Sequence, residues 1–275
     1  MAEQVWINGE LVDPAEAHVS VFDHGLTVGD GVFETLKAVG GRPFALRRHL
    51  ERLRHSAAGL SLRIPVDDDA LRAAVSDVLA ASALPLARVR ITITGGTSPL
   101  GSERGEHDAT VVVAAAALPE APSTTAACTV PWPRNERGAV AGIKTTSYAE
   151  NVVALAHARE RGCTEALFLT TTGLLCEGTG SNVFVGIDGR LVTPPLSSGC
   201  LAGVTRALVL QVTAATEEDI PGDALHAADE VFLTSTGRDV QGVNRLDGRE
   251  LAAPGELTRE AASAFAALAA AGDDP

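Results

Sequence analysis

Lys144 is the residue whose type and surroundings most directly suggest covalent chemistry. The chain has 22 basic residues, but only Lys37 and Lys144 are lysines, and Lys144 lies in the segment AGIKTTSYAEN, just ahead of three hydroxylated residues. A lysine amine that has lost its proton can form an imine with an aldehyde or ketone. Because its position alone also fits an ordinary exposed lysine, the case for chemistry depends on motifs further along the chain.

Three short motifs downstream of Lys144 could supply a carboxylate and an anion site. Glu177 lies in CEGTGSNVF, which we interpret as a glycine-rich turn between strands. Gly203, Val204 and Thr205 open a predicted helix, where backbone N–H groups and the helix dipole favour an anion such as phosphate. Thr236, in FLTSTG at a strand end, could add a hydroxyl. Each motif taken alone fits a plain helix cap or turn equally well.

The elements that must position these residues are strands and helices mixed in both halves of the chain. Alternating or β-branched apolar runs predict strands at QVWING, HVSVF, GVFETLKAV, ARVRITIT, ATVVVAAAAL, EALFLT, NVFVGI, RLVTPP and EVFLTS. Apolar residues at helical spacing predict helices at LRRHLERLRHSAAGL, DALRAAVSDVLAAS, YAENVVALAHARERG, VTRALVLQVTAA and residues 256–271. Regular βαβ alternation and a G-x-G-x-x-G turn are both missing from the sequence, which favours an α+β fold over a dinucleotide-binding one.

A composition change marks the predicted division into lobes. The segment PEAPSTTAA is rich in proline, serine and threonine and is typical of a connector. We therefore predict a small N-terminal α+β lobe at residues 1–120 and a larger C-terminal lobe at residues 126–275, which carries the motifs described above.

Composition also narrows the classes of partner. The formal net charge of −13 disfavours nucleic acid and anionic membranes as main partners, because phosphate binding needs a basic face. The sequence lacks a signal-peptide pattern and an uncharged apolar run of roughly 20 residues, so we expect a soluble, cytoplasmic protein. The four cysteines and seven histidines lack metal-binding spacings, and we predict no metal site.

Taken in order, the motifs resemble those of the class IV pyridoxal-phosphate aminotransferases. The matching segments are DHGLTVGDGVFETL, HLERL, Lys144, EGTGSNVF, TPPLSSGCLAGVTR and DEVFLTSTG, which run from about Val5 to Asn244 together with the sequence around them. The family includes branched-chain and D-amino-acid aminotransferases and 4-amino-4-deoxychorismate lyase. The resemblance implies the α+β fold called type IV, with two α/β lobes, the cofactor pyridoxal 5'-phosphate between them, and a homodimer.

The resemblance also implies a role for each candidate residue. Lys144 matches the lysine that binds the cofactor as a Schiff base and moves protons, and Glu177 matches the carboxylate that faces the pyridine nitrogen. The phosphate is expected to be bound by Arg52, Val204, Thr205 and Thr236. Tyr148 is expected to reach the cofactor or the substrate, although a partly buried aromatic side chain is the plainer interpretation.

Two local features bear on which reaction follows. Tyr148 lies four residues after Lys144, a spacing that resembles bacterial aminodeoxychorismate lyases more than branched-chain enzymes, whose tyrosine lies one place later. Arg90 matches an arginine that branched-chain enzymes and some lyases carry, and Arg88 should share its face of the strand. Arg90 could bind a substrate carboxylate, or both arginines could pair with surface carboxylates. D-amino-acid aminotransferases have an arginine and a histidine after GTSP, where this chain has Leu100 and Ser102.

We therefore predict a lyase of folate biosynthesis that forms 4-aminobenzoate and pyruvate from 4-amino-4-deoxychorismate, a small anionic amine, by Schiff-base elimination. The alternative is a class IV aminotransferase that acts on branched-chain or other amino acids, with D-amino acids less favoured. A non-catalytic vitamin B6 carrier is a third possibility, but it would not need Lys144 and Glu177 together.

Overall fold

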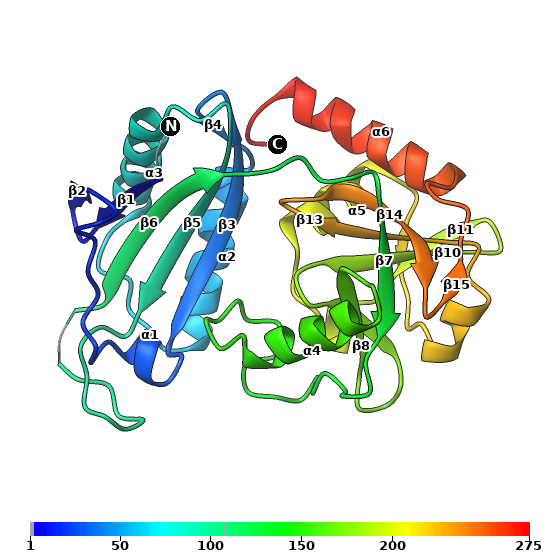
Figure 1. Cartoon of the computed structure of the whole chain (residues 1–275), viewed down its shortest axis with the longest axis horizontal. Coiled ribbons are helices and arrows are strands. Elements are labelled where there is room, and N and C mark those ends of the chain that lie inside the picture. Colours follow the sequence, from blue (N-terminus) through cyan, green and yellow to red (C-terminus); the bar gives the residue numbers. More distant parts are fainter. Residues whose placement is uncertain (1–2, 107) are drawn as a thin grey trace. The chain divides into compact units, whose positions relative to one another are not determined.

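The protein is described by a computed structural model that covers residues 3–106 and 108–275. The chain divides into two compact units (Figure 1). The first consists of Met1–Pro119, Ile143–Ser147 and Asp273–Pro275, and the second of Glu120–Gly142 and Tyr148–Gly272. The lobe boundaries expected from the sequence stay a prediction, and residues 1, 2 and 107 of the predicted N-terminal lobe lie outside the described residues.

The first unit is built on an antiparallel sheet of six strands with the order β2-β1-β6-β5-β3-β4. Its elements are β1 Gln4–Ile7, β2 Glu10–Val12, α1 His24–Thr27, β3 Gly31–Val39, β4 Arg42–Pro43, α2 Leu46–Gly59, α3 Asp68–Ser82, β5 Leu86–Thr94 and β6 Thr110–Ala117. Helices α2 and α3 pack against the sheet and form one core with it (Figure 1).

Periodicity in the sequence explains this core. Side chains of β5 alternate, so that Val89, Ile91 and Ile93 are buried while Arg88 and Arg90 are exposed. On α2, Leu50 and Leu53 lie one turn apart and are fully buried in the same cluster. Burial of a side chain of this size stabilises the fold by about 1.5–3 kcal/mol. The sheet therefore presents one apolar face to the helices and places its arginines on the other.

The second unit is built on a sheet of nine strands, eight of them in the order β12-β11-β10-β13-β14-β7-β8-β9 and the ninth, β15, paired with β14. Its strands are β7 Thr124–Thr129, β8 Glu165–Leu169, β9 Leu175–Gly178, β10 Asn182–Ile187, β11 Arg190–Thr193, β12 Thr216–Glu217, β13 Glu230–Ser235, β14 Asp239–Leu246 and β15 Arg249–Glu250. Its helices are α4 Ala149–Glu160, η1 Leu196–Ser198, α5 Val204–Val212, η2 Gly222–His226 and α6 Glu256–Ala271. Helix α4 packs on β7 and β8, whereas α5 and α6 pack on the β13–β14 side of the sheet (Figure 1).

Three local predictions are wrong in whole or in part. HVSVF, residues 18–22, is not a strand; it forms a loop in which Val19, Val21 and Phe22 are exposed. The predicted connector PEAPSTTAA is irregular at residues 119–123, as expected, but residues 124–127 belong to β7 and alternate between half-buried and buried positions in the sheet. Glu177 lies within β9 and not in the turn, which follows at residues 179–181. The start of β7 pairs with the distant strand β14, and β9 pairs with its neighbour β8; residue type alone does not show either pairing.

Candidate functional site

Lys144 belongs to the first unit, where a short segment of chain runs alongside the end of β3. The N–H of Phe33 donates to the carbonyl of Lys144 at 3.1 Å, and the N–H of Thr146 donates to the carbonyl of Gly31 at 2.8 Å. The N–H of Lys144 donates to the hydroxyl of Ser56 on α2 at 3.2 Å. These bonds hold the backbone of Lys144 at a fixed place beside β3 and α2.

The side chain of Phe33 lies next to two cations. The Nζ of Lys144 lies 4.3 Å from the centre of the Phe33 ring, and the guanidinium carbon of Arg90 lies 3.7 Å from it. Both distances are within the range of cation–π attraction. The structure thus brings together two of the residues singled out from the sequence, and Arg90 also donates to the hydroxyl of Thr92 at 3.1 Å.

Arg52 takes part in a buried cluster with Glu34 and His49. Its Nε and Nη2 donate to the two carboxylate oxygens of Glu34 at 2.8 and 2.7 Å, and Nδ1 of His49 lies 2.7 Å from Glu34 Oε2. Burial alone would raise the pKa of the Glu34 carboxyl, but Arg52 and His49 together lower that pKa to about 2. Burial lowers the pKa of His49, and the charges of Arg52 and Lys144 act in the same direction. Glu34 is therefore an anion that fixes the orientation of Arg52.

Glu177 belongs to the second unit and is held from two sides. Its Oε2 accepts a hydrogen bond from the N–H of Leu201 at 2.8 Å. Its Oε1 lies 3.5 Å from Nε of Arg134, a residue of the loop that follows β7. On the sheet, Glu177 pairs with Phe168 of β8. A cation and a backbone donor thus stabilise the charged form of a half-buried carboxylate.

Helix α5 begins three residues beyond Leu201, whose N–H bonds to Glu177. Its N-cap is Gly203, which makes no side-chain capping bond, and the first turn contains no acidic residue. Val204 and Thr205 are the first two helical residues, as the sequence predicts, and both are buried. The first N–H groups of a helix have no acceptor within the helix. The start of α5 therefore has the donors and the dipole that suit an anion.

Space at the start of α5 depends on Gly203. A Cβ at this position would collide with Oδ1 of Asn182 at the start of β10, whose amide donates to the carbonyl of Leu201 at 2.8 Å. Asn182 pairs with Thr234 of β13, and the hydroxyl of Thr234 is buried with no hydrogen-bond partner among the described residues. Gly203 thus lies where the start of α5 meets the ends of strands β10 and β13.

Two further candidates lie on this unit. Tyr148 is the residue before α4 and accepts a helix bond from the N–H of Val152 at 3.0 Å. Thr236 follows the last residue of β13 and is half-buried. Lys144, Arg52 and Arg90 belong to one unit, whereas Tyr148, Glu177, Val204, Thr205 and Thr236 belong to the other. The assigned roles of all eight residues stay predictions.

Sequence reasoning missed Arg134, Glu34 and His49. His49 and Arg52 stand three apart in HLERL, which places both on the same face of a helix, so their spacing was an available signal. Glu34 also had a signal, because it is an acidic residue within an otherwise largely apolar predicted strand, GVFETLKAV. Arg134 had no such signal, because its neighbours in the structure come from β8, β9 and α4.

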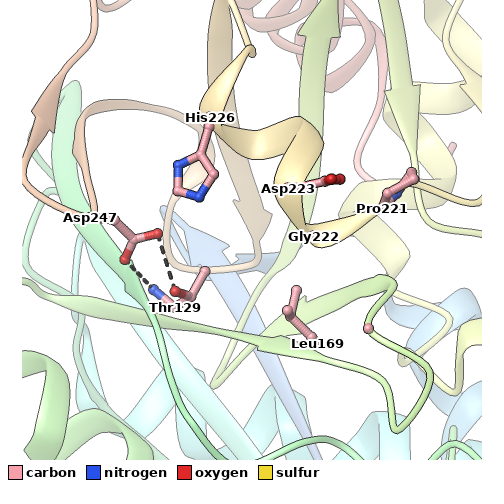
Figure 2. A pocket seen from close by; sticks show the side chains of 8 residues that line it. Thr129, Leu169, Pro221, Gly222, Asp223, His226 and Asp247 are labelled. Carbon is pink, nitrogen blue, oxygen red and sulfur yellow. Dashed lines mark hydrogen bonds between the residues drawn. The ribbon is translucent and has the colours of Figure 1, made fainter.

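A pocket of about 500 Å³ lies elsewhere on the second unit. Figure 2 shows its lining, in which Asp247 accepts bonds from the N–H and the hydroxyl of Thr129 at 2.7 and 3.1 Å. The other lining residues are Leu169, Gly173, Pro221, Gly222, Asp223 and His226. None of the eight candidate residues lines this pocket, and we assign it no role in the site.

Metal-binding clusters and membrane-spanning helices are both missing from the described residues, 3–106 and 108–275. Within these ranges no group of three or more His, Cys, Asp or Glu side chains is placed to hold a metal ion. No helix in the same ranges is both long and apolar enough to cross a membrane. Cys128, Cys163, Cys176 and Cys200 are buried free thiols.

Comparison with known proteins identifies the family. The family model described as amino-transferase class IV matches residues 31–246. A putative branched-chain-amino-acid aminotransferase of Methanocaldococcus jannaschii is 33% identical over 273 residues, which cover 95% of both chains. The crystal structure of a branched-chain aminotransferase from Thermoproteus uzoniensis with norvaline superposes with a TM-score of 0.91 at 31% identity, over 96% of this chain and 93% of that one.

A third similar protein was solved with a cofactor derivative. It is a T.th. branched-chain amino acid aminotransferase complexed with N-(5'-phosphopyridoxyl)-L-glutamate, with a TM-score of 0.88 at 28% identity, over 96% of this chain and 92% of that one. The chain belongs to the class IV aminotransferase family, and its α+β fold is that of the fold type IV enzymes. The resemblance in the motifs is thereby confirmed at the level of family and fold.

Proposed function

We propose that this protein is a pyridoxal-phosphate-dependent aminotransferase whose substrates are branched-chain amino acids. The observation that carries the proposal is the similarity to branched-chain aminotransferases over almost the full length of both chains. It reverses the ranking that the motif around Lys144 favours, in which the lyase comes first.

As a member of this family, the protein uses pyridoxal 5'-phosphate, and the residues present fit that group. When bound, the cofactor supplies an aldehyde for attachment and a protonated ring that withdraws electrons from the substrate α-carbon. In the second unit, Glu177 is a carboxylate suited to a ring N–H, because cationic and N–H donors already stabilise its charge. The start of α5 suits a phosphate, and Gly203 keeps the space open.

The first unit supplies the amine and cations. Lys144 is the residue that we assign to attachment and to proton transfer at the substrate α-carbon. Its neighbourhood includes Arg90, whose guanidinium lies over the same Phe33 ring, and the buried cluster of Arg52 and His49. Arg52, oriented by Glu34, is assigned to the phosphate. Arg90, on the exposed face of β5, is assigned to the substrate carboxylate.

A lyase that acts on 4-amino-4-deoxychorismate is the second candidate. The observation in its favour is the position of Tyr148, four residues after Lys144, at the residue that precedes α4. The same lysine, carboxylate and phosphate donors would serve either reaction, so the substrate decides between them.

The test supplies both substrate classes to the same holoenzyme. L-leucine, L-valine and L-isoleucine, each with 2-oxoglutarate, are compared with D-alanine and with aminodeoxychorismate, and we measure glutamate formation and 4-aminobenzoate release. We expect turnover of the branched-chain L-amino acids and no aminobenzoate. Aminobenzoate release without amino-acid turnover would replace the proposal with the lyase. Lys144→Ala should abolish either activity, whereas Lys37→Ala, a change at the other lysine, should retain it.

We also propose a homodimer, as the family resemblance implies. Residues 19–28, which include α1, expose five large apolar side chains, each 46–69% exposed: Val19, Val21, Phe22, Leu26 and Val28. Several exposed apolar side chains in one short segment are typical of a protein–protein contact. Sedimentation should give twice the chain mass of 28.3 kDa, and Phe22→Asp should lower that mass toward the monomer. A monomeric wild-type protein would contradict the proposal.

A further inference from the structure

Arg134 is placed against Glu177 by a set of contacts that the proposed function does not use. Its N–H donates to the carbonyl of Leu169 at 2.7 Å, and the residue forms a parallel bridge with Thr170, so its backbone continues the edge of β8. The side chain is only 16% exposed. Its position is therefore fixed by the sheet and not by an exposed, mobile loop.

The guanidinium of Arg134 is held in one orientation. It lies 4.1 Å from the ring centre of Phe168, which is fully buried and pairs with Glu177 across the β8–β9 ladder. Nη1 donates to Glu150 at 2.5 Å and Nη2 to Asn151 at 2.8 Å. These contacts fix both terminal nitrogens and the plane of the group, and Nε lies on the side of Glu177.

The contact between Arg134 and Glu177 is electrostatic. Nε lies 3.5 Å from Glu177 Oε1, and within residues 3–106 and 108–275 this buried N–H has no hydrogen-bond partner. A carboxylate offers about four lone-pair sites. Arg134 therefore places a full positive charge beside Oε1 without making the hydrogen bond that would use one of those sites.

Two buried thiols next to Glu177, Cys176 and Cys200, add no charge beside it near pH 7. Burial raises the pKa of the Cys176 thiol and of the Cys200 thiol, and the charge of Glu177 raises both further. Both thiols are neutral near pH 7. Glu150 of α4 is mostly exposed and faces the far side of the Arg134 guanidinium.

We propose that Arg134 is a positioning residue that keeps Glu177 as a fixed carboxylate, so that the proton between Glu177 and the cofactor ring stays on the ring nitrogen. A carboxyl beside a cation holds a proton less tightly, which leaves that proton on the ring. The protonated ring is the stronger electron sink. This inference rests on the proposed function, since it assumes that Glu177 faces the ring.

The test compares Arg134→Gln, Arg134→Lys and wild type after loading with ¹⁵N-labelled pyridoxal phosphate. The ring-nitrogen chemical shift is followed against pH, and kcat and KM are measured separately. Near pH 7 the ring-nitrogen shift should indicate the most fully protonated ring in wild type, a less protonated ring in Arg134→Lys and the least protonated ring in Arg134→Gln. We expect kcat of Arg134→Gln to fall roughly 100-fold, which is the usual effect of removing one preorganised group that stabilises the transition state. KM should change less than about threefold.

Arg137→Gln is the matched control, because Arg137 lies three residues further on and its side chain is 83% exposed. It should keep the wild-type ring-nitrogen shift and kcat. A folded Arg134→Gln variant with the wild-type ring-nitrogen shift near pH 7 would overturn the inference, whatever its thermal stability. If that variant does not fold, a wild-type shift in Arg134→Lys overturns it instead. Failure of wild type itself to bind the labelled cofactor would reject the proposed function and not the role of Arg134 alone.

Discussion

Glu34 is a fully buried carboxylate that depends on Arg52 and His49 for its charge. Its pKa of about 2 lies below the ordinary value of 4.5, so its contribution to stability is present above pH 4.5 and is lost as the pH falls toward 2. The pair joins β3 to α2 in the first unit. Removing the two charged groups from water costs free energy, and their mutual attraction offsets that cost only while both partners are present.

Glu34→Gln should therefore destabilise the protein by about 3–5 kcal/mol near pH 7, because it leaves the Arg52 charge buried without its anion. Urea unfolding measures this free energy. The variant should also lose less stability than wild type when the pH is lowered from about 5 to about 3. Glu51→Gln, on the exposed side of α2, removes an ion pair with Arg47 and should cost no more than about 0.5 kcal/mol. Equal effects of the two changes would contradict this account of the cluster.

The start of α5 is the element on which phosphate binding is proposed to depend. Gly203 has backbone angles that any residue can adopt, φ −65° and ψ 134°, so the glycine is needed for space and not for its conformation. An added methyl group would have to displace Asn182 or the turn before the helix. Overpacking of this kind typically costs about 1–3 kcal/mol.

Gly203→Ala should lower the free energy of unfolding by about 1–3 kcal/mol and weaken pyridoxal-phosphate binding, because the N–H groups of Val204 and Thr205 move with the turn. Equilibrium dialysis and thermal unfolding measure the two effects. Gly180→Ala is the control, since a Cβ there would meet no atom within 4 Å. Unchanged cofactor affinity in Gly203→Ala would remove α5 from the proposed site.

The loop after β5 is tied to α1 through a buried histidine. Nδ1 of His24 lies 2.8 Å from Asp30 and Nε2 lies 2.8 Å from the carbonyl of Gly101, so both ring nitrogens face acceptors and both must donate. The bond to Asp30 and then the bond to Gly101 raise the pKa of His24. Asp30 also accepts two bonds from Arg104, and the guanidinium lowers the pKa of that carboxyl.

The sign of the pH effect follows from the raised pKa. The stability that His24 contributes is fully present below its ordinary pKa of 6.5 and is lost as the pH rises through the higher value of the folded state. Between about pH 6 and about pH 9, wild type should lose more unfolding free energy than His24→Gln does. His55→Gln, at an exposed position of α2, should retain the wild-type slope. Parallel slopes in wild type and His24→Gln would show that the buried ring does not titrate as described.

Across the whole molecule, elements with strong internal periodicity were predictable from the sequence. β3, β10 and α6 have the expected positions, and Gly162 ends the turn after α4 with a positive φ of 68°. β14 was not predicted and the first part of β7 was interpreted as a connector, because their polar and small residues lack a strand pattern and take their places through pairing with each other and with β13 and β8. The partners of Glu177 and Glu34 come from distant segments, and such contacts depend on the tertiary fold.

The reaction was less predictable than the family. The cofactor motifs extend over most of the chain, and the family model matches residues 31–246 accordingly. Substrate preference was inferred from a few side chains, chiefly Tyr148 and Arg90, and the spacing of one tyrosine favoured a lyase. Similarity over nearly the full chain favours an aminotransferase, because it depends on many more positions than Tyr148 and Arg90.

The most direct test of the central claim is reduction of the cofactor-saturated protein with borohydride, followed by peptide mass spectrometry. We predict a pyridoxyl group on the peptide that contains Lys144, none on the peptide that contains Lys37, and none in Lys144→Ala. An unmodified Lys144 in saturated wild-type protein, or modification of Lys37 in its place, would contradict the assignment on which the proposed function depends.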